Sequence, residues 1–366
     1  MPIYMDVHIV PGVKAQNVAE AHYQDLIHQE EYGCKCMTYW VDETRESIFC
    51  LIEAPDKDAV KEMHQKAHGL LPNKIIEVSS SVVQSFLGRI YDPEDVQTTN
   101  EGLKVFSDPS FRILLVTKTV DPVLLQYKFG VEKANELLKD QNNIVRRNIA
   151  QWNGAEVQHG GTGFIISFPS AASAISCALA IQTDLPTSQG DIIGFKMSIN
   201  GGEPIEKSNK LFGDAIQLAR YFFAIPKDFK LIVASAVKEL ALKDHFEHNG
   251  NSFVTVSPHD EALLESLFNK LEEKFHDANF DVDDYCKEMA MSTSQLYRKT
   301  VALTGLSPNI LLKEFRLEKA KEMMKKQHSS ISQITFDSGF TSPSYFTKCF
   351  KQKYGLLPMN YIELLQ

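Results

Sequence analysis

The sequence of 366 residues predicts a multidomain protein in which two α+β domains precede an all-α C-terminal domain. Three observations support this prediction. Strand-like and helix-like stretches alternate up to about residue 257, a polar stretch interrupts them at 88–109, and only helix-like patterns follow residue 262. We therefore expect domains at 1–87, 110–257 and 262–366, with residues 88–109 as a linker.

The first domain is expected to follow the order β-α-β-β-α-β. "MPIYMDVHIV" is typical of a strand, "VAEAHYQDLIHQEEYG" of a helix that ends at Gly33, and "CKCMTYWVD" with "SIFCLIEAP" of a hairpin. A second helix, "KDAVKEMHQKAHG", and a last strand, "KIIEVSSSVV", complete the series. This order is that of a ferredoxin-like fold.

The middle domain shows a second alternation. "FRILLVTKTV" is typical of a buried strand, "ANELLKDQNNIVRRNIAQWNG" of a long amphipathic helix, and "AEVQHGGTGFIISF" of a hairpin. "SAASAISCALAIQ" and "FGDAIQLARYFFAI" are expected helices, and "GFKMSINGGEP" and "KLIVAS" expected strands. Such alternation indicates an α+β sandwich.

The C-terminal domain contains two helix-turn-helix patterns. In the first, a short helix precedes Ser292, a suitable N-cap for a second helix that Gly305 can close. A helix that starts with a proline follows, "SPNILLKEFRLEKAKEMM", with an expected buried stripe of Ile310, Leu317, Ala320 and Met324. The second pattern places turns at Gly339 and Gly355, and an expected aromatic core of Phe340, Tyr345, Phe346 and Phe350.

Charge is divided unequally along the chain. The net charge is -9, yet residues 285–366 carry 12 Lys and Arg against 6 Asp and Glu, which leaves 26 against 41 for residues 1–284. This division indicates that the tail alone meets a polyanion, although a charged helical surface can also be merely solvated. Six scattered cysteines indicate reduced thiols, and the sequence has neither a signal-peptide pattern nor a membrane-length apolar run, so we expect a cytoplasmic protein without membrane contact.

The strings "FRLEKAKEMM" and "ISQITFDSGFTSPSYFTKCFKQKYGLLP" resemble the DNA-binding domain of AraC-type transcription regulators. The resemblance implies two helix-turn-helix units joined by a rigid helix, with two recognition helices in successive major grooves of a double-stranded DNA operator. An arginine there can pair with guanine, and lysines can contact phosphates. The implied DNA-binding residues are Ser294, Tyr297 and Arg298 in the first unit, Ser344, Thr347 and Lys348 in the second, and Lys299, Lys351 and Lys353 at phosphates.

Histidines are concentrated in the first domain. His64 and His68 lie four residues apart on an expected helix, a spacing that suits a metal ion but also occurs in solvated or hydrogen-bonded pairs. The strings "MDVHIVPGV", "AEAHYQDL", "YWVDE", "FCLIEAPD" and "HQKAHGLLP" resemble a small ferredoxin-like family that includes a nickel-binding protein. The resemblance implies His8, His22, His64 and His68 as ligands of nickel, zinc or copper, with Cys34, Cys36, Cys50, Asp25 and Asp42 also available.

The strings "WNGAEVQHGGTGFIISFPSAASAISCALAIQ", "INGGEP" and "LFGDAIQLARYFFA" resemble the class III nucleotide cyclase domain. That family holds two metal ions with two carboxylates. Here the first strand offers no Asp and Thr162 replaces the second carboxylate, while Gln158, Gln217 and Tyr221 stand at three further functional positions. We expect no catalytic residues and no cyclase activity; a role in dimerisation and a role as a ligand pocket both stay open.

These patterns together predict a sequence-specific DNA-binding transcription regulator that is not an enzyme. Its N-terminal domains are expected to sense an effector of unknown identity and to mediate homodimerisation, so that effector binding changes how two DNA-binding domains are spaced. A metal-buffering protein with secondary DNA binding is one alternative, and an active nucleotide cyclase is another.

Overall fold

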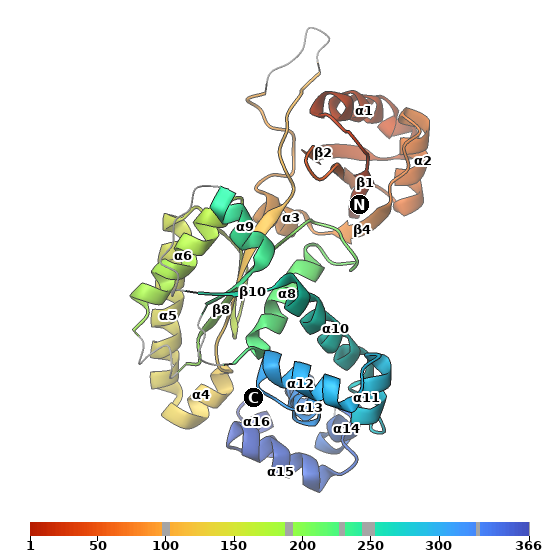
Figure 1. Ribbon diagram of the computed structural model, residues 1–366. Coiled ribbons are helices and arrows are strands. Elements are labelled where there is room, and N and C mark those ends of the chain that lie inside the picture. Colours follow the sequence, from red (N-terminus) through yellow and green to blue (C-terminus); the bar gives the residue numbers. More distant parts are fainter. Residues whose placement is uncertain (97–102, 187–192, 227–230, 244–252, 327–329, 366) are drawn as a thin grey trace.

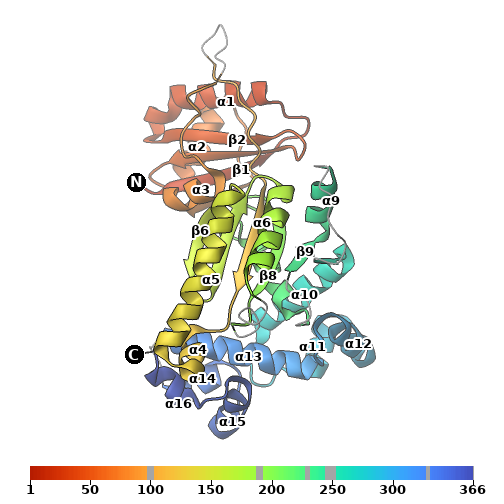
Figure 2. The ribbon, with the colours of Figure 1, turned by 90° about the vertical axis from the view of Figure 1, so that its left-hand side faces the viewer.

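The computed structural model shows three bodies stacked in chain order, with the N-terminal domain at one end and the C-terminal helices at the other (Figures 1 and 2). It describes residues 1–96, 103–186, 193–226, 231–243, 253–326 and 330–365. The two α+β domains and the all-helical third domain confirm the predicted fold class. No described helix is both long and apolar enough to cross a membrane, and all six cysteines are free and buried.

The N-terminal domain has the predicted ferredoxin-like order. Its antiparallel sheet has the strand order β2-β3-β1-β4. Gly33 ends the first helical segment with a φ of 62°, as the sequence predicted. The elements are β1 (Ile3–Ile9), α1 (Ala15–His28), a 3₁₀ turn (Gln29–Tyr32), β2 (Lys35–Asp42), β3 (Ser47–Glu53), α2 (Lys57–Ala67) and β4 (Lys74–Val78).

Strand β1 separates two cores because successive side chains point to opposite faces of a sheet. Met5 and Val7 join a core shared with the middle domain, whereas Tyr4 packs in the core beneath α1 and α2. Asp6 and His8 fall on the same face as Tyr4 and are almost fully buried. The strand therefore places two polar side chains beneath the helices.

The last strand of this domain is shorter than predicted. β4 ends at Val78, and "SSVVQSFL" forms helix α3 (Ser80–Leu87), which packs on strands of the middle domain. The prediction that the strand continues through "SSSVV" was wrong, because the serines can begin a helix and the apolar residues of α3 are buried at a helical spacing. Phe86 packs on Phe212 of the middle domain, with ring centroids 4.6 Å apart.

The polar stretch after α3 contacts the first domain where it is described. Arg89 forms an ion pair with Asp108 at 3.0 Å and donates to the Tyr39 carbonyl at 2.6 Å, and Phe106 stacks on the Tyr39 ring. Residues 97–102 of the expected linker lie outside the described residues. The domain boundaries stay a prediction, but composition alone did not indicate these contacts.

The middle domain is a six-stranded mixed sheet with the order β10-β9-β8-β5-β7-β6. β5 is antiparallel to β7 and β8, and β9 is parallel to its neighbours β8 and β10. Helices α5 and α6 pack together (Figure 2), while α8 packs on β5 and β8. The elements are β5 (Arg112–Lys118), α4 (Pro122–Phe129), α5 (Val131–Gln151), β6 (Ala155–Gly160), β7 (Gly163–Phe168), α6 (Ala171–Asp184), β8 (Lys196–Gly202), α8 (Gly213–Tyr221), a 3₁₀ turn (Phe222–Ala224), β9 (Leu231–Ala234), α9 (Ser235–Lys243) and β10 (Val254–Val256).

Helix α10 (Pro258–Lys274) connects the middle domain to the C-terminal helices and belongs to the cores of both. Its Phe268 stacks on Tyr221 of α8, with ring centroids 4.7 Å apart. On the other side, Tyr285 of α11 (Val282–Glu288) donates a hydrogen bond to the Leu267 carbonyl at 2.9 Å. This helix was not predicted as a separate element.

The C-terminal domain has the two predicted helix-turn-helix units. The helices are α11 (Val282–Glu288), α12 (Thr293–Thr304), α13 (Pro308–Lys325), α14 (Ile331–Asp337), α15 (Pro343–Tyr354) and α16 (Pro358–Glu363). Ser292 forms a capping box with Gln295, and Gly305, Gly339 and Gly355 have φ of 68°, 81° and 84°. On α13 the buried stripe holds Leu311 in place of Ile310, which is 42% exposed, so that prediction was wrong by one residue.

Candidate metal centre and nucleic-acid interface

Four side chains meet beneath the helices of the N-terminal domain. Asp6 lies opposite Cys50 in the sheet, and His8 follows Asp6 on the same face of β1. His64 reaches the strands from α2, with its Nε2 at 2.9 Å from the Asp6 carboxylate; His8 Nε2 lies 3.3 Å from the other Asp6 oxygen. One ligand atom from each of the four lies within 4.8 Å of the others, and all four residues are buried.

A second group shares His64 and uses its other ring nitrogen. His64 Nδ1 lies 3.0 Å from Asp25 Oδ1 on α1, and His68 Nε2 lies 3.2 Å from the same oxygen. His68 Nδ1 accepts a hydrogen bond from the Leu70 backbone N–H at 3.2 Å. The predicted spacing of His64 and His68 therefore brings the two rings together, with nitrogen atoms 3.1 Å apart.

The carboxylates around His64 control its charge. Burial alone would lower the pKa of His64. The negative charges of Asp6 and Asp25, and their hydrogen bonds with the ring, outweigh burial and raise the pKa to about 10. Burial alone would raise the pKa of Asp6, and His64 and His8 instead hold it well below its usual range. Burial, with Asp6 and Asp25, raises the pKa of the Cys50 thiol well above its usual value. Without a metal ion the cluster is a buried, charge-paired network.

This cluster fits a transition-metal ion on two observations. The donors are two imidazoles, a carboxylate and a thiol, which are the ligand types that bind nickel, zinc or copper. His8 is 2% exposed, and no hydrogen bond to its Nδ1 is present in the described part of the chain, although buried polar atoms normally have a partner.

The predicted ligands are not all brought together. His8, His64 and His68 lie in the two groups, whereas His22 on α1 faces Asp92 at 3.5 Å and packs against Tyr39. Asp6 was not singled out from the sequence, although its position two residues before His8 on a strand places both on one face. The role of all these residues in metal binding stays a prediction.

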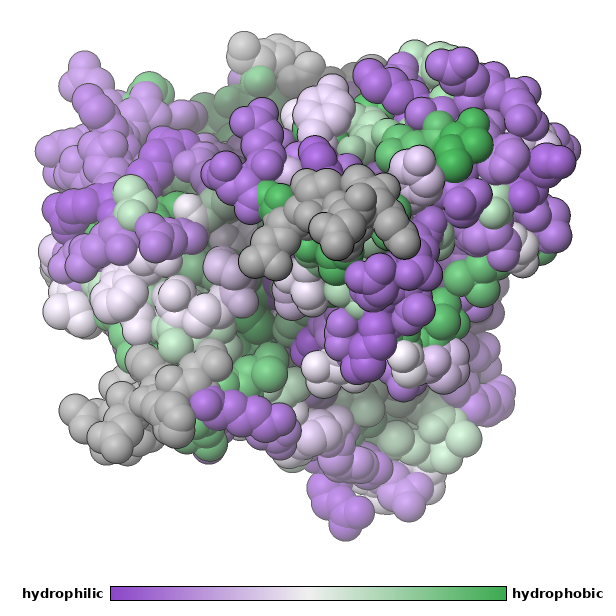
Figure 3. Space-filling model, turned by 90° about the horizontal axis from the view of Figure 1, so that it is seen from above, coloured by the Kyte–Doolittle hydropathy of each residue, from purple (hydrophilic) through white to green (hydrophobic). Residues whose placement is uncertain are grey.

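The face of the molecule seen from above is mainly hydrophilic, with small hydrophobic patches (Figure 3). Within the domain, His64 is fully buried and the side chain of His68 is 15% exposed. His68 is thus the more accessible of the two neighbouring imidazoles.

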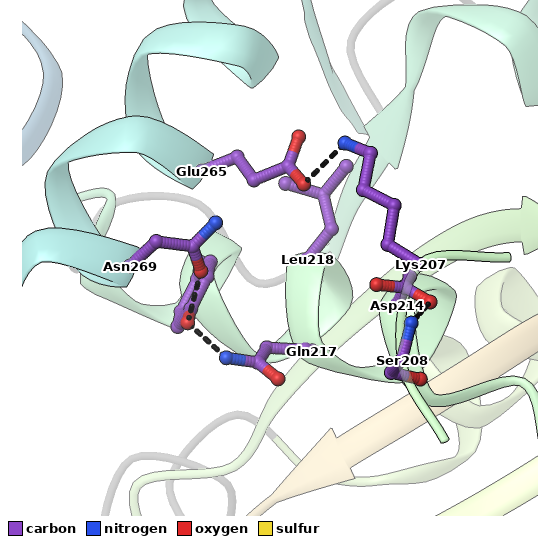
Figure 4. A pocket seen from close by; sticks show the side chains of 8 residues that line it. Lys207, Ser208, Asp214, Gln217, Leu218, Glu265 and Asn269 are labelled. Carbon is purple, nitrogen blue, oxygen red and sulfur yellow. Dashed lines mark hydrogen bonds and ion pairs between the residues drawn. The ribbon is translucent and has the colours of Figure 1, made fainter. Parts of the chain in front are cut away.

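A polar pocket of about 230 Å³ lies between α8 and α10 (Figure 4). Gln217 donates to the Tyr221 hydroxyl, which hydrogen-bonds to Asn269 of α10 at 3.1 Å. At the rim Lys207 forms an ion pair with Glu265 at 3.1 Å. Of the two helix positions that differ from the cyclase pattern, Tyr221 therefore contacts helix α10, and Gln217 is hydrogen-bonded to Tyr221.

The two recognition helices repeat each other closely. α12 and α15 each have 12 residues, begin after Ser292 and Ser342, and end at Gly305 and Gly355, a constant offset of 50 residues. Two pairs of equivalent positions are buried, Leu296 with Phe346 and Thr300 with Phe350. The other faces are open: Ser294, Tyr297, Arg298, Ser344, Lys348 and Lys351 are exposed, and Lys299 and Thr347 are half-buried.

Lys353 and Tyr345 of the second unit have surroundings that the sequence did not indicate. Lys353 lies at the contact with α13, where its ammonium is 2.7 Å from Glu314 and 3.2 Å from Glu318. Tyr345 was predicted in the core but is 52% exposed, because it lies one residue from the buried Phe346 and a helix turns by about 100° per residue. Tyr345 therefore belongs to the open face of α15.

The C-terminal domain is attached to the middle domain at a second point besides α10. Asp121, 3% exposed, accepts a hydrogen bond from the Tyr361 hydroxyl at 2.8 Å and lies 2.6 Å from the Lys325 ammonium. Val123 next to it packs in the core of the second helix-turn-helix unit. The open faces of α12 and α15 are left uncovered by these contacts.

Comparison with known proteins gives two family matches. Residues 4–78 match the family of the nickel responsive protein SCO4226, and residues 285–363 match a helix-turn-helix domain family. These matches confirm the resemblance to AraC-type DNA-binding domains and the resemblance to a small ferredoxin-like family that includes a nickel-binding protein.

Three similar proteins illustrate the matches. "Histidine kinase P4" of Formosa agariphila is 34% identical over 270 residues, which are 71% of this chain and 19% of that protein. The HTH-type transcriptional regulator MtrA of Neisseria gonorrhoeae is 32% identical over 99 residues, 27% of this chain and 31% of the relative. The chain thus spans about a fifth and a third of these relatives. The structure of a bacterial light-regulated adenylyl cyclase aligns with this chain at 13% identity and a TM-score of 0.31. The aligned part covers 66% of this chain and 87% of the cyclase chain.

Proposed function

We propose that this chain is a transcription regulator that responds to a transition metal, because residues 4–78 match the nickel responsive SCO4226-like family and residues 285–363 match a helix-turn-helix domain family. The observation that carries the DNA-binding half is the repeat of α12 and α15, two capped helices with equivalent open faces. Helix α13, which has 18 residues and is about 27 Å long, joins the two units. Two recognition helices joined in this way would enter successive major grooves on one face of the DNA.

The residues proposed to contact DNA occupy these open faces. Arg298 and Lys348 stand at equivalent positions near the N-terminal half of each helix, where recognition helices read base edges. Ser294, Tyr297, Ser344 and Thr347 are the neighbouring base readers of the proposal. Lys299 and Lys351 are assigned to phosphates, and Tyr345 is added to the proposed surface. Lys353 is omitted because two carboxylates already hold it.

The proposed effector is a divalent ion of nickel, zinc or copper bound in the cluster around His64. The bound ion would supply positive charge to a buried site that now contains two carboxylates. Asp6, His8, Cys50 and His64 would hold it, and α1 and α2 would exclude water from it. Contacts within the chain would then transmit a movement at the metal site to the DNA-binding domain.

That route begins directly after the cluster. Lys74 follows His68 by six positions, and its ammonium donates to the carbonyls of Glu206, Lys207 and Ser208 at 3.1, 2.7 and 2.6 Å. Lys207 in turn pairs with Glu265 on α10. Because α10 packs against the first helix-turn-helix unit, a shift of the 68–74 segment bears on the DNA-binding domain through this series of contacts.

The test is the DNA affinity of the full chain on a selected operator at fixed salt, with and without stoichiometric Ni²⁺, Zn²⁺ or Cu²⁺. We expect one ion to change the affinity at least fivefold, the low end of ordinary allosteric coupling. The change should vanish in His64→Ala and persist in His28→Ala, whose ring lies on α1 beside Glu31 and outside both groups. Tight metal uptake with unchanged DNA affinity would favour a metal-buffering protein instead.

The middle domain is proposed to connect and pair the chains without catalysis. Among the described residues, groups of three or more metal-ligating side chains occur only in the N-terminal domain. The proposed protein is a cytoplasmic homodimer. Sedimentation of the full chain tests the dimer, and incubation with ATP or GTP and Mg²⁺ tests the absence of cyclase activity.

A further inference from the structure

The two helix-turn-helix units are attached to the middle domain at different points. The first unit joins the apolar core that includes α10, in which Leu296 of α12 and Leu264 of α10 are both fully buried. The second unit has a core of its own, which Val123 of α4 enters from the middle domain. Helix α13 takes part in both cores, with Leu312 in the first and Leu317 in the second. The middle domain therefore contacts both ends of the DNA-binding domain.

Asp121 forms the polar part of the second attachment. It is the N-cap of α4, where its Oδ1 accepts a hydrogen bond from the Val123 backbone N–H at 3.1 Å. Its Oδ2 accepts a hydrogen bond from the Tyr361 hydroxyl of α16 at 2.8 Å and lies 2.6 Å from the Lys325 ammonium of α13. Because hydrogen bonds of charged groups are short and depend strongly on geometry, this one buried carboxylate fixes α4, α13 and α16 relative to one another.

Tyr361 connects Asp121 to the recognition helix α15. Burial and the charge of Asp121 raise the pKa of Tyr361 well above its usual value, so the hydroxyl keeps its hydrogen and donates it. The Tyr361 ring is fully buried and lies edge-on to Phe350 of α15, with ring centroids 5.9 Å apart. Phe350 follows the exposed Lys348 by two positions, which places the two side chains about 200° apart around the helix. The ring of Tyr361 thus supports α15 from the side opposite its open face.

The second unit is also held together internally at the C-terminal end of α15. Glu318 of α13 accepts a hydrogen bond from the Tyr354 hydroxyl at 2.9 Å and lies 3.2 Å from the Lys353 ammonium. Because α15 is joined to α13 in this way, the second unit is expected to move as one body. Its orientation relative to the first unit then depends on α13 and on the attachment at Asp121 and Val123.

This orientation matters because two recognition helices must enter the DNA at set positions. Successive turns of the major groove are about 34–36 Å apart, or about 10–10.5 base pairs. One base pair inserted between two half-sites adds about 3.4 Å and about 35° of rotation between them. A unit that can reorient would tolerate this insertion, whereas a unit that is held in place would lose its contacts with one half-site.

We propose that Asp121 of the middle domain is a positioning residue for DNA recognition, which holds α15 at a fixed separation and orientation from α12 and so makes the protein strict about half-site spacing. The residue acts through Tyr361 and Lys325 and does not itself touch DNA. The inference rests on the DNA-binding half of the proposed function and does not involve the metal ion.

The test measures binding of the full chain to a selected operator and to copies of it with one or two base pairs inserted between the half-sites. Affinity is recorded by fluorescence anisotropy at fixed salt without added metal. For the unaltered chain we expect one inserted base pair to weaken binding by about 30-fold or more, because the base contacts of one half-site are lost. Asp121→Asn and Tyr361→Phe should weaken binding to the operator by about 3- to 10-fold and lower the insertion penalty to less than about fivefold, because the second unit then samples several orientations.

The insertion penalty separates positioning from stability. A smaller fraction of folded chain weakens binding to both DNAs by the same factor, so it leaves the ratio of the two affinities unchanged. Ser167→Ala is the matched control, because it removes a buried hydrogen bond of 2.8 Å from Ser167 of β7 to the Phe86 carbonyl of α3. This variant should keep the full insertion penalty.

An insertion penalty in Asp121→Asn and Tyr361→Phe equal to that of the unaltered chain would overturn the inference. The same holds if the unaltered chain tolerates the insertions. Tyr361→Phe removes only the hydroxyl and keeps the ring beside Phe350, so it stays informative if Asp121→Asn fails to fold. Failure of the unaltered chain to bind any selected DNA would refute the proposed function, and the inference with it.

Discussion

Lys74→Met should separate metal binding from DNA binding. The substitution keeps the aliphatic part of the side chain but removes an ammonium that three carbonyls of the middle domain bind at 2.6–3.1 Å. Hydrogen bonds of charged groups contribute about 1.5–3 kcal/mol each, and two of these three are exposed. We expect the free energy of unfolding to fall by about 1.5–3 kcal/mol in total, measured by urea denaturation.

The same variant should reduce the effect of the metal ion on DNA affinity. Fluorescence anisotropy on one operator, with and without Ni²⁺, would show the ratio of the two dissociation constants approaching one, while the metal affinity stays unchanged. Lys66→Met is the matched control, because Lys66 is an exposed lysine on α2. A full metal-dependent change of affinity in Lys74→Met would refute the proposed route through residues 206–208.

Four further substitutions test the C-terminal domain and its contact with the middle domain. Arg298→Ala should cost about 1–3 kcal/mol on the preferred operator and relax specificity at one base pair, whereas Lys351→Ala should weaken binding to all sequences and lower the salt slope by about 1, both measurable by anisotropy at several salt concentrations. Asp121→Asn, which weakens the buried contact to Tyr361 and Lys325, should lower the free energy of unfolding by about 1–3 kcal/mol in urea denaturation. Burial alone would raise the pKa of Glu318, but Lys321, Lys353 and Lys118 hold it well below its ordinary value of 4.5. The stability that this carboxylate contributes is therefore present above pH 4.5 and is lost as the pH falls. Glu318→Gln should make the free energy of unfolding depend less on pH in the acid range.

The sequence predicted the architecture well where hydrophobic periodicity and capping agreed. The N-caps and glycine C-caps of α12 and α15 are local signals, and each helix begins and ends where they indicate. The prediction was less accurate where a shift of one residue decides whether a side chain lies on the buried or the exposed face of a helix. Ile310 and Tyr345 were each assigned to the core next to a residue that is buried instead, because a periodic pattern defines the buried stripe less sharply than packing does.

The candidate metal centre was only partly predictable. Strand alternation places Asp6 beside His8 on one face of β1, so that signal was present in the sequence. Cys50 lies opposite Asp6 through the pairing of β1 with β3, two strands that no hairpin joins, so no local pattern gave this register. His22 could not be assigned in this way. Its partner Asp92 comes from the stretch after α3, whose return to the first domain depends on contacts such as Arg89 with Tyr39 that no local pattern encodes.

Helix α10 has a practical consequence for dividing this chain into fragments. Five of its side chains are buried, and Arg316 of α13 donates to the carbonyls of Phe275, Asp277 and Phe280 just after it. Gly339 lies so close to the Phe275 carbonyl that an added Cβ would be 2.0 Å from the oxygen. A DNA-binding fragment excised at residue 281 would therefore lose the surface on which both of its units rest. A chimaera that exchanges the sensory part should make its junction before Ser257, so that α10 travels with the helices it supports.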